Sequence, residues 1–145
     1  MNVFVTGHTS GLGKAIYDLC QSYDYHTVGL SRSTGFDLTK NLENFVLNSF
    51  LAMGLRNEDA KIFTDALMFS ELRFHSGQGQ GVQRITTYYK RIKNKEVNIN
   101  IDLDIVKESS SLALVDAKNG IGTVQASKCM DIAITKAKNE GIGQV

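Results

Sequence analysis

The sequence predicts an α/β fold, in which a short β-α-β unit over residues 1–40 precedes a mainly helical segment with two short strands over residues 41–145. Three observations lead to this prediction. The chain opens with an apolar strand, a glycine-rich loop and an amphipathic helix, and a second strand follows directly. After Thr39, patterns of helical period replace the alternation of strand and helix.

The first strand is centred on Val3, Phe4 and Val5, in a stretch where four of the first five residues are apolar, as expected of a buried parallel strand. Three glycines follow, and glycine adopts backbone angles closed to other residues and lets a ligand approach closely. The helix behind them offers free N–H groups and the positive end of its dipole to an anion. The pattern predicts a phosphate site, with an ordinary strand–turn–helix as the alternative.

The helix after the loop has one continuous apolar face, formed by Leu12, Ala15, Ile16, Leu19, Cys20 and Tyr23. A second strand is predicted over His26–Leu30, and it ends in Ser31-Arg32-Ser33. The run Gly35–Thr39 is typical of a short third strand, with no helix between it and the second.

The spacing Thr6-Gly7-x-x-x-Gly11-x-Gly13 resembles the cofactor loop of short-chain dehydrogenases/reductases, which implies a truncated Rossmann-like unit. The resemblance implies that Arg32, beside Ser33, accommodates the 2′-phosphate of NADP, and that Asp37 contacts the adenine edge. No acidic residue lies near Arg32, and a guanidinium suits a phosphate, so we expect NADP(H) over NAD(H). A solvated surface charge is the alternative for Arg32. The loop residues expected to bind the dinucleotide are Gly7, His8, Thr9, Ser10, Gly11, Leu12 and Gly13.

Length, composition and charge bound the class of protein. The 145 residues suffice for one ordinary domain or two small units, and a hydrophobic content of 42% supports a real core. A net charge of +1 gives no electrostatic argument for nucleic acid or a membrane surface. Cys20 and Cys129 have no metal-like spacing, and neither a signal peptide nor a membrane-spanning run is visible, so we expect a cytoplasmic protein without a metal site.

The second segment reads as helices with two strands. Helical patterns cover Leu42–Met53, ended by Gly54, then Ala60–Phe74, Val82–Ile92 and Val124–Ala137, with a glycine-rich break at Ser76–Gly81. The run Val97–Ile105 alternates with a period of two and predicts a half-buried strand or extended segment. A second strand is expected over Ser111–Asp116, a turn at Asn119-Gly120, and the beginning of a further strand at Ile142–Val145.

The segment from Leu42 to Val145 resembles the N-terminal part of the malate/L-lactate dehydrogenase family, which lacks a standard Rossmann fold. The motifs that carry the resemblance are Ala66-Leu67, Ser70–Arg73, Gly81–Arg84 with Tyr89 and Arg91, Ala113–Gly122 and Ala133–Gly143. The resemblance implies that Arg84 binds the substrate carboxylate, for which a guanidinium is chemically suited. The family's proton-transfer histidine is not matched, and His75, a few residues earlier, is either its displaced equivalent or a structural or exposed residue.

Tyr89 and Lys93 have the Tyr-x-x-x-Lys spacing of the catalytic pair in short-chain reductases, with Ser76 upstream. We reject this pair, because the residues between Asp37 and Ser76 read as helices and leave no room for the strands that carry that site.

Three functions follow from these patterns. The first is an NAD(P)-dependent oxidoreductase that transfers hydride to or from a carbonyl or 2-hydroxy acid substrate. The second is a non-catalytic nucleotide-binding module, and the third is a catalytically incomplete fusion or fragment of two dehydrogenase families. A sheet this small leaves its edges exposed, so we expect a homo-oligomer or docking of the helical half.

Overall fold

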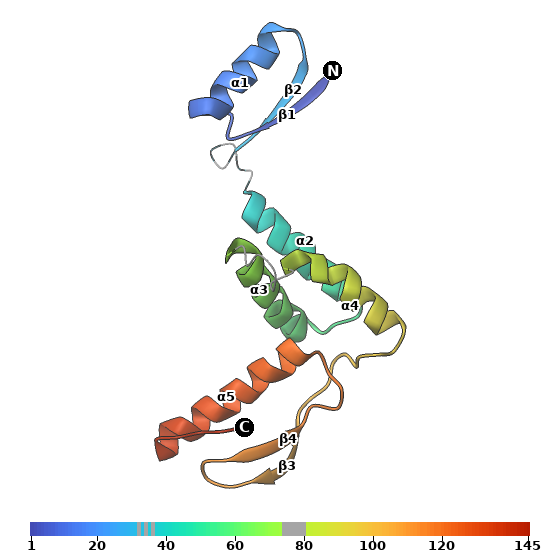
Figure 1. Cartoon of the computed structure of the whole chain (residues 1–145), viewed down its shortest axis with the longest axis vertical. Helices are drawn as coiled ribbons and strands as arrows, with labels where there is room; N and C mark the ends of the chain where they lie inside the picture. Colours follow the sequence, from blue (N-terminus) through green and yellow to red (C-terminus); the bar gives the residue numbers. More distant parts are fainter. Residues whose placement is uncertain (32, 34, 36, 74–80) are drawn as a thin grey trace. The chain divides into compact units, whose positions relative to one another are not determined.

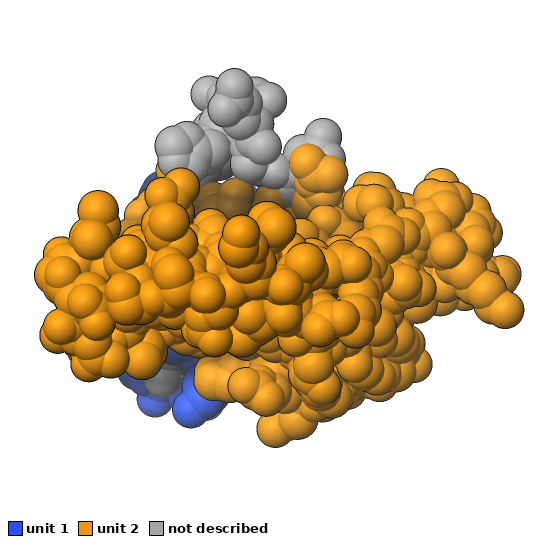
Figure 2. All heavy atoms as spheres, turned by 90° about the horizontal axis from the view of Figure 1, so that it is seen from below, with its two compact units in different colours: residues 1–44 blue, residues 45–145 orange. Residues whose placement is uncertain are grey.

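The computed structural model describes residues 1–31, 33, 35, 37–73 and 81–145. The chain divides into two compact units, Met1–Asn44 and Phe45–Val145, which are coloured separately in Figure 2. The division falls inside helix α2 (Leu38–Ala52). The α/β architecture, with a short parallel sheet and helices, confirms the predicted fold class.

The first unit is built from β1 (Asn2–Thr6), α1 (Gly11–Ser22) and β2 (His26–Leu30) (Figure 1). The two strands pair in parallel in a regular register from Asn2 opposite His26 to Thr6 opposite Leu30. A parallel pair needs a crossover connection, and α1 supplies it. The predicted strand, helix and strand are therefore confirmed in position and order.

The apolar face of α1 is largely exposed, which differs from the burial that an amphipathic pattern leads one to expect. The less exposed residues of the helix are Gly13, Tyr17 and Cys20, and none of its side chains is fully buried. This side is displaced by one position from the predicted apolar face. The close packing of Gly13 accounts for this orientation of the helix, because a Cβ at position 13 would lie 2.4 Å from the Gly7 carbonyl oxygen.

The predicted third strand over Gly35–Thr39 is wrong for the residues that the structure describes there. Asp37 precedes α2, which begins at Leu38. The Asp37 carboxylate accepts hydrogen bonds from the backbone N–H groups of Thr39, at 2.9 Å, and Lys40, at 3.3 Å. An aspartate just before an amphipathic run caps a helix, and this local signal prevails over the short strand-like pattern.

The helices of the second unit enclose a dense apolar core. They are the part of α2 from Phe45 onward, α3 (Asn57–Arg73), the short 3-10 helix η2 (Gly81–Gln83), α4 (Arg84–Lys93) and α5 (Gly122–Glu140). Phe50 stacks on Phe63 at 4.5 Å between ring centroids, and Phe63 meets Tyr88 edge to face at 4.6 Å. Val46, Phe50, Phe63 and Val124 have at most 1% of their surface exposed.

The antiparallel hairpin of β3 (Asp104–Glu108) and β4 (Ala113–Asp116) follows α4. The strand predicted over Val97–Ile105 begins only at Asp104, and the segment before it forms a single bridge, between Asn98 and Gly120. The predicted alternation of burial nevertheless holds from Val97 to Leu103. Asn100 has a φ of +59°, which interrupts the extended backbone.

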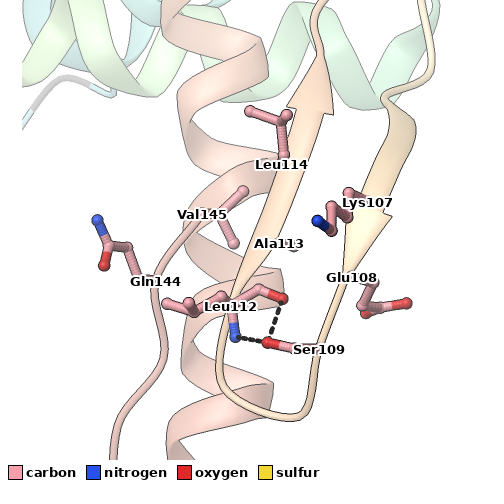
Figure 3. A pocket seen from close by; sticks show the side chains of 8 residues that line it. All are labelled: Lys107, Glu108, Ser109, Leu112, Ala113, Leu114, Gln144 and Val145. Carbon is pink, nitrogen blue, oxygen red and sulfur yellow. Dashed lines mark hydrogen bonds between the residues drawn. The ribbon is translucent and has the colours of Figure 1, made fainter.

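Helix α5 ends at Gly141, whose φ of +80° gives the left-handed cap that glycine favours. The chain then returns to the hairpin, where Gln144 accepts a hydrogen bond from the Ala113 N–H at 2.9 Å and donates one to the Ser111 carbonyl at 2.9 Å. This parallel bridge corresponds to the strand beginning predicted at Ile142–Val145. A cavity of about 520 Å³ lies here, lined largely by apolar groups that include Leu112, Leu114 and Val145 (Figure 3).

Candidate functional site

The glycine loop between β1 and α1 has the backbone that the sequence predicts for close approach of a ligand. Gly7 and Gly11 have φ values of +68° and +56°, and a Cβ at either position would meet nothing within 4 Å. The Gly7 N–H donates to the Leu30 carbonyl at 2.8 Å, which extends the parallel pairing one residue beyond β1. The loop thus leaves the sheet at the carboxyl ends of both strands, the position where open α/β sheets bind ligands.

The N-terminus of α1 has no side-chain cap. Ser10 precedes the helix in an extended conformation, and its side chain makes no capping hydrogen bond. The first N–H groups of a helix lack partners within the helix itself. This end of α1 therefore presents backbone donors and a positive dipole end that suit an anion.

Hydroxyl groups join the glycine loop to the end of β2. The Ser33 hydroxyl donates to the Thr9 hydroxyl at 3.0 Å and lies 2.9 Å from the Ser31 hydroxyl. The structure thereby brings together Thr9 and Ser33, two residues that the sequence assigns to the dinucleotide. Arg32, between the two serines, and His75 in the second unit both lie outside the described residues.

His8 has a packing role within the loop. Its ring lies 5.0 Å from the ring of Tyr17, and a Cβ at Gly29 would come within 2.3 Å of the imidazole. Glycine at position 29 thus makes room for the ring. The Nδ1 atom of His8 is buried without a hydrogen-bond partner among the described residues.

A cavity of about 320 Å³ adjoins the loop within the first unit. Thr6 and Gly7 from the end of β1, Leu30 and Ser31 from the end of β2, and Asp37–Thr39 at the start of α2 line it. Because the Asp37 carboxylate caps α2, its position is fixed beside this cavity.

Arg84, the predicted carboxylate-binding residue, is the first residue of α4. The Glu71 carboxylate of α3 holds the start of this region by accepting a hydrogen bond from the Val82 N–H at 2.9 Å. Gly81 fits against Glu71, because a Cβ there would lie 2.0 Å from the carboxylate oxygen. Arg84 is half-buried, and its guanidinium forms no ion pair or hydrogen bond with any residue that the structure describes. A guanidinium can bind a carboxylate in bidentate geometry.

Tyr89 and Lys93 also lie on α4, in the second unit, where the Lys93 ammonium is 6.0 Å from the Tyr89 ring centroid. Helices α2 and α3 occupy the chain between Asp37 and the glycine-rich break. The strands of a short-chain reductase site are therefore absent from the described residues of that stretch.

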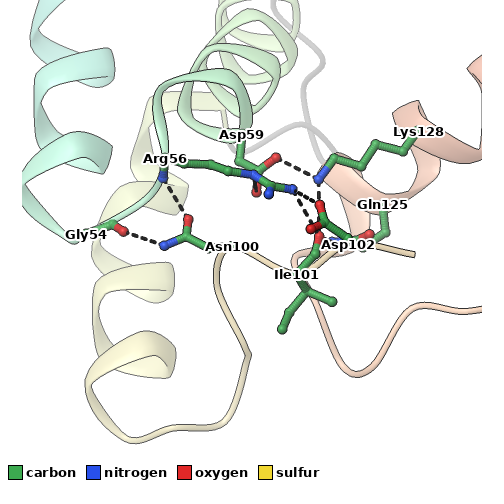
Figure 4. A network of polar contacts seen from close by, with 8 residues as sticks. All are labelled: Gly54, Arg56, Asp59, Asn100, Ile101, Asp102, Gln125 and Lys128. Atoms are coloured by element: carbon green, nitrogen blue, oxygen red, sulfur yellow. Dashed lines mark hydrogen bonds and ion pairs between the residues drawn. The ribbon is translucent and has the colours of Figure 1, made fainter. Parts of the chain in front are cut away.

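A polar network joins three segments of the second unit (Figure 4). Asp59, which is 2% exposed, forms ion pairs with Arg56 at 2.9 Å and with Lys128 at 2.7 Å. Arg56 also bonds Asp102, and this hydrogen bond raises the pKa of Arg56 and lowers the pKa of Asp102. Arg56, Gln125 and Lys128 all donate to the Ile101 carbonyl. The network fixes the segment before β3 against α3 and α5.

Sequence reasoning missed the roles of Glu71, Asp59 and Lys128. Glu71 lies eleven residues from the N–H that it binds, across the glycine-rich break. Lys128 lies 69 residues from Asp59, and no local pattern marks that pair, although the i,i+3 spacing of Arg56 and Asp59 is local. An acidic residue in the first turn of α3 is visible in the sequence, but it reads equally well as a partner of the helix dipole.

Two further observations limit the kinds of site. Within the described ranges, His, Cys, Asp and Glu side chains form no group of three that is placed to hold a metal ion. No helix in the described part of the chain has both the length and the apolar character needed to span a bilayer.

The fold and these sites define an α/β protein with a parallel glycine-loop unit and a second unit of helices and a hairpin. In the second unit, the guanidinium of Arg84 has no polar partner among the described residues. The chain belongs to the malate/L-lactate dehydrogenase family, whose pattern matches residues 39–145. It is 36% identical over 104 residues to a malate dehydrogenase of Pyrococcus horikoshii, covering 72% of this chain and 28% of that protein. It is 35% identical over 106 residues to an L-sulfolactate dehydrogenase of Methanocaldococcus jannaschii, covering 73% and 30% respectively.

Solved structures give the same result. The malate dehydrogenase structure from Pyrococcus horikoshii matches with a TM-score of 0.67 at 35% identity, over 72% of this chain and 30% of the other. A malate dehydrogenase from Entamoeba histolytica matches with a TM-score of 0.67 at 32% identity, over 72% and 29%. The chain thus spans less than a third of the length of these relatives. Residues 1–38 lie outside the family match, and their resemblance to short-chain dehydrogenases stays a prediction.

Proposed function

We propose that the chain is a cytoplasmic NAD(P)-dependent oxidoreductase, or a part of one, that acts on a 2-hydroxy acid or the corresponding carbonyl compound. The observation that carries this proposal is the family match over residues 39–145. The half-buried Arg84 supports it, because its guanidinium has no polar partner among the described residues. The relatives of this chain include a malate dehydrogenase and an L-sulfolactate dehydrogenase, and malate and sulfolactate are carboxylates. Their names support a dehydrogenase activity and a nicotinamide dinucleotide.

The first unit is the proposed dinucleotide site. The residues present fit a phosphate, because Gly7 and Gly11 leave open space, Gly13 permits close packing, and the N-terminus of α1 has no side-chain cap. In this proposal the residues Gly7, His8, Thr9, Ser10, Gly11, Leu12 and Gly13 hold the pyrophosphate region. The cavity beside Ser31 and Asp37 then receives the adenosine portion.

Arg32 and Ser33 are proposed to favour NADP(H) over NAD(H). Ser33 already lies within hydrogen-bond distance of Ser31 and Thr9 at the end of β2, where the ribose would lie. A bound nicotinamide dinucleotide supplies hydride transfer. The protein's own contribution is to position the phosphates and to orient the substrate.

Arg84 is proposed to hold the substrate carboxylate. Glu71 restrains the start of η2 through the Val82 N–H, and therefore limits the movement of Arg84 two residues later. His75 is proposed as the acid–base group, because an imidazole titrates near neutral pH and the sequence places it between the end of α3 and Arg84.

Fluorescence titration of the full chain with NADPH and NADH tests the dinucleotide site. We expect saturable binding that Gly13→Ala abolishes, since the new Cβ would collide with the backbone oxygens of Gly7 and Thr6. Gly122→Ala is the matched control, because nothing lies within 4 Å of a Cβ at that position. Arg32→Ala should weaken NADPH more than NADH. Absence of saturable binding of either cofactor would contradict the proposed site.

Turnover with malate, lactate and sulfolactate tests catalysis. Arg84→Ala should raise KM for the hydroxy acid, while His75→Ala should lower kcat. Rates equal to background in all variants would contradict catalysis.

A non-catalytic nucleotide-binding module is the second candidate. Two observations favour it. Gly7 and Gly11 of the glycine loop have positive φ angles, and the histidine motif departs from the family pattern. Saturable NADPH binding without turnover would support this candidate. If the chain showed no NADPH binding and no turnover, that result would support an incomplete fusion or fragment.

A further inference from the structure

The outer edge of β4 carries the start of a third strand, which consists of a single parallel bridge between Leu112 and Gln144. The Ala113 N–H donates to the Gln144 carbonyl, and the Gln144 N–H donates to the Ser111 carbonyl, each at 2.9 Å. At the other edge of β4, the Leu112 carbonyl accepts a hydrogen bond from the Ser109 N–H at 2.8 Å, where the hairpin closes. The backbone groups of β4 therefore alternate between β3 and the edge that carries the bridge.

Beyond this bridge, the edge of β4 has no partner among the residues that the structure describes. The N–H and C=O of one strand residue point to the same edge, and the direction reverses at the next residue. The Ala113 carbonyl and both backbone groups of Val115 therefore point to the edge that Gln144 begins to cover. Within the described ranges, no hydrogen bond from outside the hairpin reaches these groups. Such an edge is a template for a further strand.

The cavity of about 520 Å³ lies beside this open edge (Figure 3). Its lining extends from Lys107 and Glu108 of β3, across Leu112 and Leu114, to Val145. The two leucines are 49% and 61% exposed, and they lie two positions apart on one face of the hairpin. A strand added at the edge would place every second side chain on this same face, next to Leu114. The cavity and the open edge therefore suit the same kind of occupant.

We propose that the edge of β4 and this cavity dock an extended strand from the part of a malate/L-lactate dehydrogenase that lies beyond the matched stretch. The relatives contain such polypeptide, because the matched stretch is 28% and 30% of their length. The strand runs parallel to β4, in the direction set by Gln144. Backbone hydrogen bonds to Ala113 and Val115 hold it, and its alternate apolar side chains fill the cavity beside Leu114. This inference rests on the family match and on the second unit, and it does not involve the dinucleotide site.

A synthetic peptide tests the docking site. It contains the roughly ten residues that directly follow the matched stretch in the malate dehydrogenase of Pyrococcus horikoshii, and it carries a fluorescent label. Anisotropy of the peptide, titrated with the full chain, should show saturable binding with a Kd of roughly 10–500 μM, because one short strand forms few backbone hydrogen bonds. Absence of saturation up to about 1 mM chain would overturn the proposal.

Leu114→Lys tests the cavity, and Val106→Lys on β3 is the matched control. The two side chains are 61% and 62% exposed, so the hairpin should accommodate either lysine, and circular dichroism checks that both variants fold. Leu114 lines the cavity, whereas Val106 does not. Leu114→Lys should weaken peptide binding at least about tenfold, because a charge enters an apolar site, and Val106→Lys should leave the Kd unchanged. Equal affinities of the two variants would overturn the role of the cavity.

Methylation of the peptide nitrogens tests the strand pairing. In an added strand the N–H groups of every second residue face β4, and the others face away. N-methylation of the odd-numbered residues and of the even-numbered residues should therefore differ, so that one peptide loses binding and the other keeps it. Equal effects would overturn the pairing and leave apolar contact alone. NADPH titration separates this inference from the proposed function, because failure of the glycine loop to bind a dinucleotide would leave the peptide results unchanged.

Discussion

Different interactions stabilise each of the two units of the chain. In the first unit Val5 is the buried apolar side chain among the described residues, and shape is set by a parallel ladder and by glycines with positive φ. In the second unit stacked aromatic rings and a buried ion-pair network link segments that are distant in the sequence. Local backbone rules thus account for most of the first unit, whereas the second depends on tertiary packing. The first unit should therefore be the less stable of the two.

The largest expected effect comes from removing the centre of the second core. Phe63→Ala should lower the free energy of unfolding of this unit by about 3–5 kcal/mol, because the ring is 1% exposed and contacts both Phe50 and Tyr88. Urea unfolding followed by circular dichroism measures the change. Phe69→Ala on the same helix is the control, since Phe69 is 58% exposed, and it should change stability by less than about 1 kcal/mol. Similar losses for both variants would contradict a core centred on Phe63.

The buried ion pairs give the next effect. Asp59→Asn should destabilise the second unit by about 3 kcal/mol, because it leaves the charges of Lys128 and Arg56 without their buried partner. Thermal unfolding detects the loss. Asp65→Asn removes an exposed pair with Lys61 and should cost at most about 0.5 kcal/mol. A result for Asp59→Asn as small as for this control would show that the network adds little to the second unit.

The substitution Gly7→Ala tests how far the backbone of the glycine loop stabilises the first unit. The position has a φ of +68°, so alanine should cost about 1–2 kcal/mol. Hydrogen exchange should show faster exchange in β1 and β2 and unchanged protection in α3 and α5. Equal loss of protection in both units would show that they unfold together, which would contradict the expectation that the first unit is the less stable of the two.

The smallest expected effect depends on pH. The pKa of Asp102 is lowered by its hydrogen bond to Arg56, so the contact contributes stability above the unfolded pKa of about 3.9. This contribution is lost as the pH falls through the lower folded pKa. Unfolding curves between pH 5 and pH 2 should therefore converge for the wild type and Asp102→Asn. A constant difference across this range would assign the effect of the substitution to packing instead.

Much of the fold follows from local patterns. The strand, glycine loop, helix and strand of the first unit were readable because β-formers, glycines and apolar spacing fall within 30 residues. The third strand was wrong because Asp37 acts as a helix cap, which a short pattern does not distinguish from a strand end. The face of α1 was displaced because Gly13 must pack against the Gly7 carbonyl, a contact that hydrophobicity does not encode.

Some residues of the candidate sites could be predicted from local motifs, and others could not. The glycine loop and Arg84 were predicted from motifs. The structure shows positive φ angles at two glycines of the loop, and the guanidinium of Arg84 has no polar partner among the residues that the structure describes. The role of Glu71 in holding the start of α4 was not predictable, because it depends on how the chain returns after the glycine-rich break. The dinucleotide preference still rests on Arg32 and stays a prediction.

The side chain of Asn100 has a consequence for how the second unit folds. Its amide accepts a hydrogen bond from the Arg56 N–H and donates one to the Gly54 carbonyl, across 44 and 46 residues of chain. Contacts of such long range require the closure of a large loop before they contribute, and they slow the search for the native topology. If this corner closes after the folding barrier, Asn100→Ala will accelerate unfolding and leave the refolding rate nearly unchanged. Asn100 would then govern the lifetime of the native state more than the speed at which it is reached.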